Sequence, residues 1–235
     1  MEISFIIPVY NEEKNIPLLL KKLEETVENK YVDYEFIFIN DGSTDLSGEI
    51  LHSLSLNKSY VKIISLEKNS GQSKALYKGF NLAKGEIIVS LDGDLQADPT
   101  DIILLLPYLE KYDMVNGARS RRKNKNSDKL FSVLGNHLRN IIVGDDIQDV
   151  ASSMKIFKKK VLKCFYPYTG MYRILPVLAQ ISGFSVAEIP VPYYDRIFGK
   201  SNYTFYDRFF TSLKNIFIVK RIKKKKRNYN VNCFV

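Results

Sequence analysis

The first half of the chain alternates between short apolar runs and segments of helical periodicity, and this alternation restricts the possible folds more than any other feature. The apolar runs, each predicted to be a buried strand, cover residues 3–9, 35–39, 61–66 and 86–91. The segments with apolar side chains at helical spacing cover 16–27, 45–56, 73–83 and 100–112. Alternating strands and helices form a mostly parallel sheet covered by helices. The sequence therefore predicts an α/β domain whose ligands bind in the loops at the carboxyl ends of the strands.

The second half of the chain is less regular. We expect a polar, basic loop, a helix, a short strand followed by a helix, another helix and a last strand, at 120–129, 130–143, 149–161, 171–181 and 186–191. A Gly-Lys-Ser loop at 199–201 comes before a basic tail at 206–235. These boundaries predict one domain over 1–205, with halves at 1–105 and 106–205, and an appended tail.

The net charge of +9 comes almost entirely from residues 206–235, which hold nine basic residues and one acid. The rest of the chain is therefore close to neutral, whereas a nucleic-acid-binding protein carries its basic residues across the fold. Two cysteines make no disulfide framework and suit a reducing compartment such as the cytoplasm. The N-terminus lacks the basic region of a signal peptide, and no apolar stretch approaches the roughly 20 residues of a spanning helix. We therefore expect a protein that does not itself cross a membrane.

The tail at 206–235 combines an apolar helical face with a run of basic side chains. The apolar face holds Phe209, Leu213, Ile216 and Phe217, and seven basic residues follow between 220 and 227. A basic amphipathic helix of this kind can lie on an anionic membrane surface. The alternative is that the apolar face packs on the domain and the lysines are solvated. The sequence leaves both interpretations open, and binding of nucleic acid by the basic run is a weaker third.

The strongest candidate for chemistry directly follows the fourth predicted strand. Asp92 and Asp94 are separated only by Gly93, so both carboxylates can turn toward one cation, and Gln96 can add a carbonyl oxygen. Mg²⁺ and Mn²⁺ take such oxygen ligands and keep positions for phosphate oxygens. The sequence therefore predicts a Mg²⁺ or Mn²⁺ site in this loop.

Three further loops follow the first three predicted strands and are expected at the same edge of the sheet. Tyr10 follows the first strand, and its ring can stack on a nucleobase. Asp41 follows the second strand, and its carboxylate can accept a hydrogen bond from a base N–H. Asn69 begins the run Asn-Ser-Gly-Gln that opens a helix after the third strand. Together with the Asp92 loop, these residues indicate a nucleotide site.

The motifs in these loops resemble those of family 2 glycosyltransferases with the GT-A fold. The Asp-Leu-Gln-x-x-Pro form at 94–99 is similar to the polyprenyl-phosphate branch of that family, the dolichol-phosphate mannose synthase-like enzymes. The resemblance covers about residues 1–205, and one departure is Asn40, where the family usually has Asp. The matching motifs are Pro8-Val9-Tyr10-Asn11-Glu12, Asp41-Gly42-Ser43, Asn69-x-Gly71 with Ala75, Gly79, Ala83 and Gly85, Asp92 to Pro99, Asn116 to Arg119, Asn136 to Arg139, Gln148-Asp149-Val150, Gly170 to Pro176, Glu188 to Val191, and Arg196-x-x-Gly199-Lys200-Ser201.

The resemblance implies roles for several residues of the chain. The residues that would hold the nucleotide-sugar are Pro8, Tyr10, Glu12, Asp41, Asn69, Asp92, Gly93 and Lys200. The metal ligands would be Asp92, Asp94 and Gln96. The residues that would approach an acceptor phosphate are Arg119, Arg139 and Arg196, together with Ser132 and Lys129. The catalytic residues would be Asp94 and Arg119, with Asp149 as the candidate base.

The resemblance further implies metal-dependent, inverting transfer of a sugar from a UDP- or GDP-sugar to a polyprenyl phosphate, such as undecaprenyl or dolichyl phosphate. A phosphate monoester, with a second pKa of about 6, is already a nucleophile and needs cations more than a base. The protein would then be peripheral on the cytoplasmic face of the membrane, on an anionic lipid surface, with a possible membrane-spanning partner subunit. Two alternatives remain: transfer to a saccharide hydroxyl in the synthesis of a surface glycan (lipopolysaccharide or capsule), and a nonenzymatic basic binding module.

Overall fold

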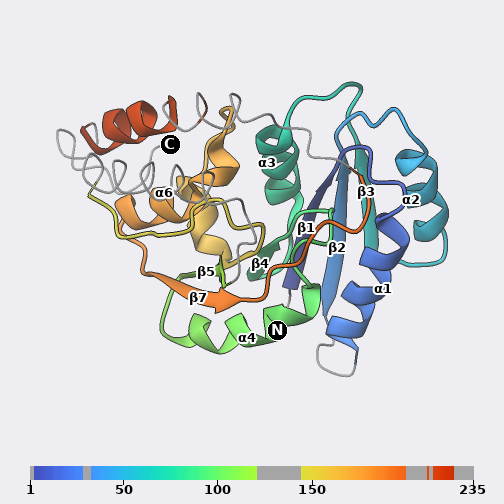
Figure 1. Cartoon of the computed structure of the whole chain (residues 1–235), viewed down its shortest axis with the longest axis horizontal. Helices are drawn as coiled ribbons and strands as arrows, with labels where there is room; N and C mark the ends of the chain where they lie inside the picture. The colour runs from blue at the N-terminus through green and yellow to red at the C-terminus, as the bar shows by residue number, and fades with distance from the viewer. Residues whose placement is uncertain (1–2, 29–32, 121–143, 200–210, 212–213, 225–235) are drawn as a thin grey trace.

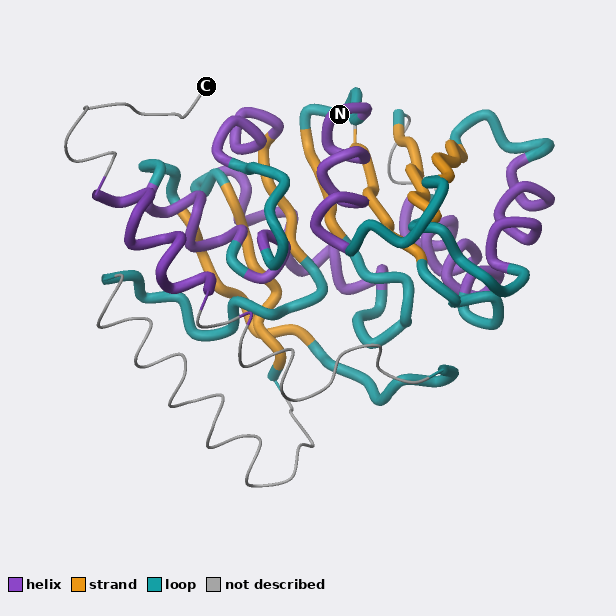
Figure 2. Tube along the Cα trace, turned by 90° about the horizontal axis from the view of Figure 1, so that it is seen from above, coloured by secondary structure: helices purple, strands orange, loops and turns teal. Residues whose placement is uncertain are grey.

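Seven strands form a sheet in the order β3-β2-β1-β4-β6-β5-β7 (Figures 1 and 2). The structure is a computed structural model that describes residues 3–28, 33–120, 144–199, 211 and 214–224. Neighbouring strands are parallel, except that β6 runs antiparallel to both β4 and β5. The strands are β1 (Ile3–Val9), β2 (Tyr34–Asn40), β3 (Val61–Ser65), β4 (Ile87–Ser90), β5 (Met114–Arg119), β6 (Lys155–Lys158) and β7 (Val186–Val191). The mixed, mostly parallel α/β sheet predicted from the sequence is confirmed.

Helices cover both faces of the sheet (Figure 1). One layer contains α1 (Ile16–Val27), α2 (Ser47–Ser55) and α4 (Ile102–Leu105). The other contains α3 (Gln72–Leu82), α6 (Leu175–Ile181) and the helical residues 214–224. On β1, Phe5 and Ile7 pack into the first layer and Ile6 packs into the second. Because both faces are buried, the central strands are apolar at nearly every position, which explains why they were visible in the sequence as continuous apolar runs.

The first four strands and the helices between them lie within a few residues of their predicted positions. β1 lies between β2 and β4 and is parallel to both. Val9 pairs with Asn40, so β1 and β2 end at the same level, and β4 ends at Ser90 beside Ile6. The loops that follow these strands therefore leave from one edge of the sheet.

The continuous helix predicted over 100–112 is wrong. The segment instead forms a 3₁₀ turn at Pro99–Asp101, the single-turn α4, and a second 3₁₀ turn at Leu106–Glu110. Pro107 accounts for the interruption, because proline lacks the N–H needed for a helical hydrogen bond.

The later elements also differ from the predicted boundaries. The helix predicted over 171–181 begins only at Leu175, after a 3₁₀ turn at Met171–Arg173. The segment predicted as a short strand and helix forms β6 and a 3₁₀ turn at Lys159–Cys164. The predicted helix 130–143 and nearly all of the predicted loop 120–129 lie outside the described residues.

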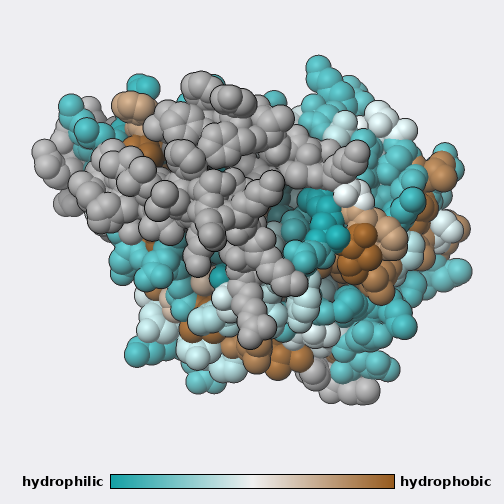
Figure 3. Space-filling view, in the orientation of Figure 1, coloured by the Kyte–Doolittle hydropathy of each residue, from teal (hydrophilic) through white to brown (hydrophobic). Residues whose placement is uncertain are grey.

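The helical residues 214–224 pack on the domain with one side only. Asn215 and Val219 are buried, whereas Phe217 is 72% exposed and Lys220 and Arg221 are exposed. Elsewhere on the face drawn in Figure 3, most of the described surface is hydrophilic, with small hydrophobic patches. Within the described part of the chain, no helix has the length and apolar character needed to cross a membrane.

Candidate active site

The loops after β1 and β2 are joined by side chain to backbone hydrogen bonds. Asn11 adopts a left-handed conformation with φ +56, and its Oδ1 accepts a hydrogen bond from the Thr44 N–H at 2.8 Å. The Asn11 N–H donates to Ser43 Oγ at 3.0 Å, and the next N–H, that of Glu12, donates to Ser47 Oγ at 2.9 Å. The two loops are therefore held together as one surface, the wall of the site, and the half-buried Tyr10 lies where this wall begins after β1.

Asp41 fastens the loop that comes before α3. Its two carboxylate oxygens accept hydrogen bonds from the backbone N–H groups of Ser70 at 2.7 Å and Gly71 at 2.8 Å. Burial raises the pKa of Asp41, although these two hydrogen bonds oppose the shift. Gly42 has φ +67, and a Cβ at this position would clash with the backbone at Asn69. Asp41 thus brings the exposed Asn69 to the same edge of the sheet as Tyr10.

The two carboxylates after β4 lie at this edge, as predicted. Asp94 is 8% exposed, and its Oδ1 accepts a hydrogen bond from the Gln96 N–H at 3.1 Å. Asp92 Oδ1 accepts a hydrogen bond from Nε2 of Gln72, the first residue of α3, at 2.6 Å. Burial, and then the negative charge of Asp94, raise the pKa of Asp92 well above its usual value. Two buried carboxylates that repel each other are stabilised by a cation placed beside them.

Arg196 connects this acidic pair to the loop after β1. Its guanidinium forms ion pairs with Asp94 Oδ2 at 2.7 Å and with Glu12 Oε1 at 3.3 Å. The other oxygen of Glu12 accepts a hydrogen bond from Asn15 Nδ2 at 2.5 Å. Burial raises the pKa of Glu12, and Asn15 and Arg196 oppose that shift. Three residues predicted from distant motifs, Glu12, Asp94 and Arg196, therefore meet in the structure.

The chemistry of this donor set fits a divalent cation that also binds phosphate. Mg²⁺ is usually held by one or two carboxylates while substrate phosphates complete its shell. Within the described segments, no group of three or more His, Cys, Asp and Glu side chains is arranged to hold a metal. As a pair of carboxylates, Asp92 and Asp94 suit a site of this shared protein–phosphate kind. Gln96 lies half-buried beside them.

Arg119, at the end of β5, forms a two-pronged ion pair with Asp149. Arg119 Nε donates to Asp149 Oδ2 at 2.7 Å, and Nη2 donates to Oδ1 at 2.5 Å. The backbone N–H of Arg119 also donates to Oδ2, at 3.0 Å, and the guanidinium lies 5.2 Å from the centre of the Tyr193 ring. Burial alone would lower the pKa of Arg119, but its hydrogen bond and charge pairing with Asp149 raise it. The predicted base Asp149 is thus a partner of the predicted acceptor-binding arginine.

Lys155 is a buried cation that the sequence prediction missed. It lies on β6 opposite Ser90 of β4 and Asn116 of β5, is 3% exposed, and donates from Nζ to the Ser152 carbonyl oxygen. Burial lowers its pKa, and the charges of Asp92 and Asp149 oppose that shift. β6 reads Lys-Ile-Phe-Lys, so its sequence gives no local sign that Lys155 is buried. A buried lysine is rare unless a charged group accompanies it.

Four of the predicted site residues lie outside the described residues. They are Lys129, Ser132, Arg139 and Lys200. Their roles stay predictions.

A cavity of about 410 Å³ lies at the opposite edge of the sheet, around the start of β1 and β2. Its lining includes Tyr34, Tyr60, Lys62 and Lys84. Lys62 pairs with Glu35 at 2.5 Å, which neutralises the buried carboxylate there. Because the cavity is far along the strands from Asp92 and Asp94, we assign the chemistry to the loops at the carboxyl edge.

The sequence model of glycosyl transferase family 2 matches residues 4–165, which include the loops after β1, β2 and β4 as well as Arg119 and Asp149. The chain belongs to this family.

A curated relative is the undecaprenyl-phosphate 4-deoxy-4-formamido-L-arabinose transferase of Photorhabdus laumondii. It is 31% identical over 206 residues, which make up 87% of this chain and 63% of the relative. The chain thus spans less than two thirds of the length of that relative.

Solved structures of similar fold include glucosyl-3-phosphoglycerate synthase from Mycobacterium tuberculosis, in complex with Mn²⁺, UDP and phosphoglyceric acid. Its TM-score is 0.71 at 17% identity, with 94% of this chain and 78% of that chain covered. TarS from S. aureus in complex with UDP-GlcNAc has a TM-score of 0.65 at 20% identity, with 95% and 69% covered. These likenesses confirm the predicted GT-A type of fold.

Proposed function

We propose that this protein is a metal-dependent, inverting glycosyltransferase that moves a sugar from a nucleotide diphosphate sugar to a polyprenyl phosphate. The observation that carries the proposal is the pair Asp92 and Asp94 at the carboxyl edge of the sheet, with Arg119 on a neighbouring part of the same edge. The name of the Photorhabdus laumondii relative supports a lipid-phosphate acceptor. The Mn²⁺ and UDP bound to the Mycobacterium tuberculosis neighbour support the donor and the metal.

On the donor side, the wall formed by the loops after β1 and β2 would bind the nucleotide. The ring of Tyr10 would stack on the base, and Asp41, Asn69 and Glu12 would fix the base and ribose. Asp92 and Asp94 would hold Mg²⁺ or Mn²⁺, and such a cation, when bound, supplies positive charge to the leaving diphosphate. Arg196 already contacts Asp94 and would approach the same phosphates.

On the acceptor side, Arg119 would bind the attacking phosphate. A phosphate monoester with a second pKa of about 6 is largely ionised at neutral pH and carries its own nucleophilic oxygen. What the protein must supply is a fixed cation, and the planar guanidinium binds phosphate with paired hydrogen bonds. Asp149 stays the candidate base should the acceptor be a hydroxyl group.

The helical residues 214–224 would place the domain on an anionic membrane surface, where a polyprenyl phosphate lies. The side turned away from the domain presents Phe217, Lys220, Arg221 and Lys224. An apolar side chain next to exposed cations suits the boundary between headgroups and acyl chains. We place the protein on the cytoplasmic face, with a membrane-spanning partner subunit as a possible further component.

The direct test is release of UDP or GDP from a panel of nucleotide-sugars, with Mg²⁺ or Mn²⁺, in the presence of undecaprenyl phosphate or of undecaprenol. We expect turnover that needs a divalent cation and the phosphate group. Arg119→Ala should weaken use of the acceptor, whereas Lys111→Ala, which removes an exposed cation elsewhere, should not. Transfer to a saccharide but to no polyprenyl phosphate would refute the proposed acceptor and favour the surface-glycan alternative.

Binding to vesicles tests the membrane surface separately. The triple variant Lys220→Gln, Arg221→Gln, Lys224→Gln should lose most of its binding to phosphatidylglycerol vesicles. The matched triple variant at the exposed positions Lys21, Lys78 and Lys111 removes the same charge from other surfaces and should bind like the unchanged protein. Equal binding by both variants would remove this helix from the proposal.

A further inference from the structure

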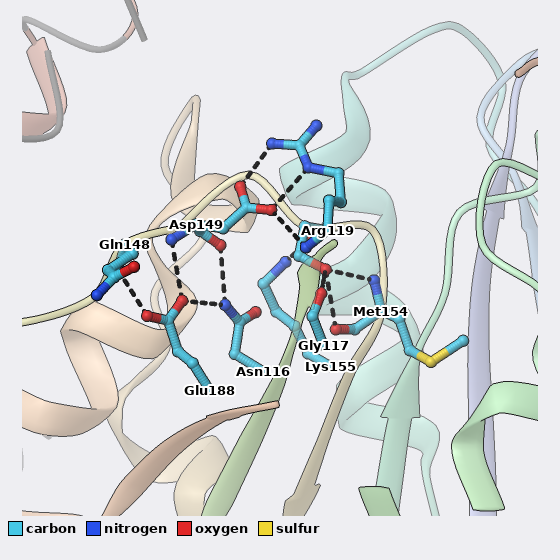
Figure 4. Close-up of polar contacts among 9 residues, drawn as sticks. Asn116, Gly117, Arg119, Gln148, Asp149, Met154, Lys155 and Glu188 are labelled. Atoms are coloured by element: carbon cyan, nitrogen blue, oxygen red, sulfur yellow. Dashed lines mark hydrogen bonds and ion pairs between the residues drawn. The ribbon is translucent and has the colours of Figure 1, made fainter. Parts of the chain in front are cut away.

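The carboxylate of Glu188, on β7, gathers three hydrogen-bond donors from two other segments (Figure 4). Its Oε1 accepts from Asn116 Nδ2 at 3.0 Å and from the Asp149 N–H at 2.9 Å, and its Oε2 accepts from the Gln148 N–H at 2.6 Å. Hydrogen bonds to an ionised acceptor are among the stronger ones in proteins. Glu188 therefore fixes the backbone of residues 148–149 against β5 and β7.

Asn116 connects this carboxylate to the same loop a second time. Its side chain is fully buried, and its Nδ2 also donates to the Asp149 carbonyl oxygen at 2.8 Å. Asp149 is therefore held at its N–H by Glu188 and at its carbonyl by Asn116. With the backbone fixed on both sides, the direction of the Asp149 side chain is set by rotation about its own bonds alone.

The Asp149 carboxylate in turn orients Arg119. Three donors of Arg119 converge on it, at distances from 2.5 to 3.0 Å: Nε, Nη2 and the backbone N–H. A paired contact of this kind fixes the plane of the guanidinium as well as its position. The chain of contacts runs from Glu188 through Asp149 to Arg119, as Figure 4 shows.

We infer that Glu188 is a positioning residue, which sets the plane of the Arg119 guanidinium by holding Asp149 in place. The role of Arg119 toward an acceptor phosphate rests on the proposed function, whereas its orientation by Glu188 does not. The hydrogen-bond partners of the Glu188 side chain among the described residues are Asn116, Gln148 and Asp149, and not Arg119, Asp92 or Asp94. The contacts that connect Glu188 to Arg119 run through Asp149.

Glu188→Gln tests this inference, because it keeps the size of the side chain and replaces one accepting oxygen by an N–H donor. Two-dimensional NMR of the arginine Nε–H groups reports on Arg119 directly, and Arg119→Lys identifies its signal. We expect the Arg119 signal to shift or broaden in Glu188→Gln and in Asp149→Asn. Glu110→Gln, an exposed change of the same kind, should leave it in place. An unchanged signal in Glu188→Gln, with a shift in Asp149→Asn, would overturn the inference.

Binding gives the functional side of the same test, with farnesyl phosphate as a short acceptor probe and UDP with Mn²⁺ as the donor probe. In Glu188→Gln we expect the Kd for farnesyl phosphate to rise about tenfold, which corresponds to about 1.4 kcal/mol. The Kd for UDP with Mn²⁺ should change less than about twofold, because its proposed ligands lie elsewhere. A general loss of structure would weaken both, and that result would overturn the positioning role.

The two proposals fail in different ways. If the unchanged protein binds UDP with Mn²⁺ but not farnesyl phosphate, the proposed acceptor is wrong, and the Arg119 signal still decides the role of Glu188. If Glu188→Gln does not fold, Glu188→Asp replaces it in the test, because aspartate keeps the charge but has a side chain shorter by one methylene. In that variant a displaced Arg119 signal supports the inference, and an unchanged signal contradicts it.

Discussion

The loops after β1, β2 and β4 and the network of Arg119, Asp149, Asn116 and Glu188 lie on one edge of the same sheet, but they are built in different ways. The β1–β4 loops follow parallel strands that alternate with helices, and their functional side chains lie within a few residues of a strand end. The Arg119 network joins β5, β7 and the segment before β6 through contacts 30 to 72 residues apart in sequence. Residues of the first region can therefore be located from strand ends in the sequence, although distant contacts such as Asp41 with Ser70 and Arg196 with Asp94 also hold them in place. In the second region, only the tertiary contacts indicate which residues act together.

This difference divides the proposed chemistry as well. The β1–β4 loops would supply carboxylates for a cation and an aromatic ring for a base, each within a few residues of the end of its own strand. The Arg119 network supplies one cation whose orientation depends on several partners. We therefore expect single substitutions in the first region to remove a ligand outright. In the second region, each substitution should remove one of several partners of Arg119 and so weaken activity only in part.

The largest expected effect is that of Asp94→Asn. In the proposed function Asp94 would hold the cation beside the leaving diphosphate, so its removal should lower sugar transfer by about 100-fold or more, as loss of a charge-stabilising group in an active site commonly does. The measurement is UDP or GDP release at saturating nucleotide-sugar with Mn²⁺. Asp33→Asn, an exposed carboxylate at the opposite edge of the sheet, is the matched control and should retain full activity. Comparable activity in the two variants would remove Asp94 from the catalytic machinery.

The packing of α3 on the sheet gives the next largest effect, on stability. Gly79 faces β1 and β2, and a Cβ there would clash with Ile6 and come 2.7 Å from Ile39 Cδ1. Overpacking of this kind costs about 1–3 kcal/mol, so Gly79→Ala should lower the free energy of unfolding by about 2 kcal/mol in urea titrations. Asn81→Ala, on the exposed side of the same helix, should not destabilise the protein. A stable Gly79→Ala variant would show that the packing of α3 on β1 and β2 tolerates more adjustment than the close approach of Ile6 and Ile39 suggests.

Asp149→Asn is expected to have a smaller effect, on acceptor use. With the charge of Asp149 removed, Arg119 loses its strongest partner, and we expect the KM for polyprenyl phosphate to rise about tenfold while kcat changes little. Asp146→Asn, an exposed neighbour in the same loop, should behave like the unchanged protein. A collapse of kcat with an altered pH–rate profile would instead identify Asp149 as the base, and would favour a hydroxyl acceptor.

The smallest effect is expected at Asp101, in the 3₁₀ turn that comes before α4. Burial, and then the charge of Asp98, raise its pKa to about 6, and its Oδ2 is buried without a hydrogen-bond partner among the described residues. The folded protein then binds this proton more tightly than the unfolded chain, so the stability contributed by Asp101 is lost as the pH rises through about 6. Asp101→Asn should stabilise the protein by about 1 kcal/mol at pH 7, and by less near pH 4.

The neighbouring Asp98 provides the control of opposite sign. Burial alone would raise its pKa, but the hydrogen bond from Lys22 and those from Thr100 lower it. Asp98→Asn should therefore destabilise the protein at pH 7, and the loss should shrink in acid. The free energy of unfolding of both variants is measured by urea titration at pH 4 and at pH 7. If Asp101→Asn and Asp98→Asn change it in the same direction at pH 7, this account is contradicted.

The sequence sufficed where the determining interactions are local. Continuous apolar runs marked β1, β2 and β4 because these strands are buried on both faces, and Asp92 and Asp94 were evident as acids directly after one of them. Pro107 was the local signal for the break in the predicted 100–112 helix. Its effect depended on where the chain packs, so periodicity alone predicted too long an element.

The sequence did not suffice where a role depends on distant partners. Glu188 was visible only as part of a motif, since nothing near it in sequence indicates that it holds the backbone of Asp149. Lys155 looked like one polar residue in a short strand, and its burial beside Asp92 and Asp149 follows from the antiparallel insertion of β6 between β4 and β5. The pairing of Asp149 with Arg119 likewise required the tertiary structure.

The central claim is that Asp92 and Asp94 hold a divalent cation together with the diphosphate of the donor. Electron paramagnetic resonance of Mn²⁺ measures this most directly, as the loss of free Mn²⁺ signal when protein and UDP or GDP are added. We predict that binding needs both protein and nucleotide, and that Asp92→Asn and Asp94→Asn each weaken it at least about tenfold, whereas Asp33→Asn does not. Unchanged Mn²⁺ binding in both variants would contradict the claim.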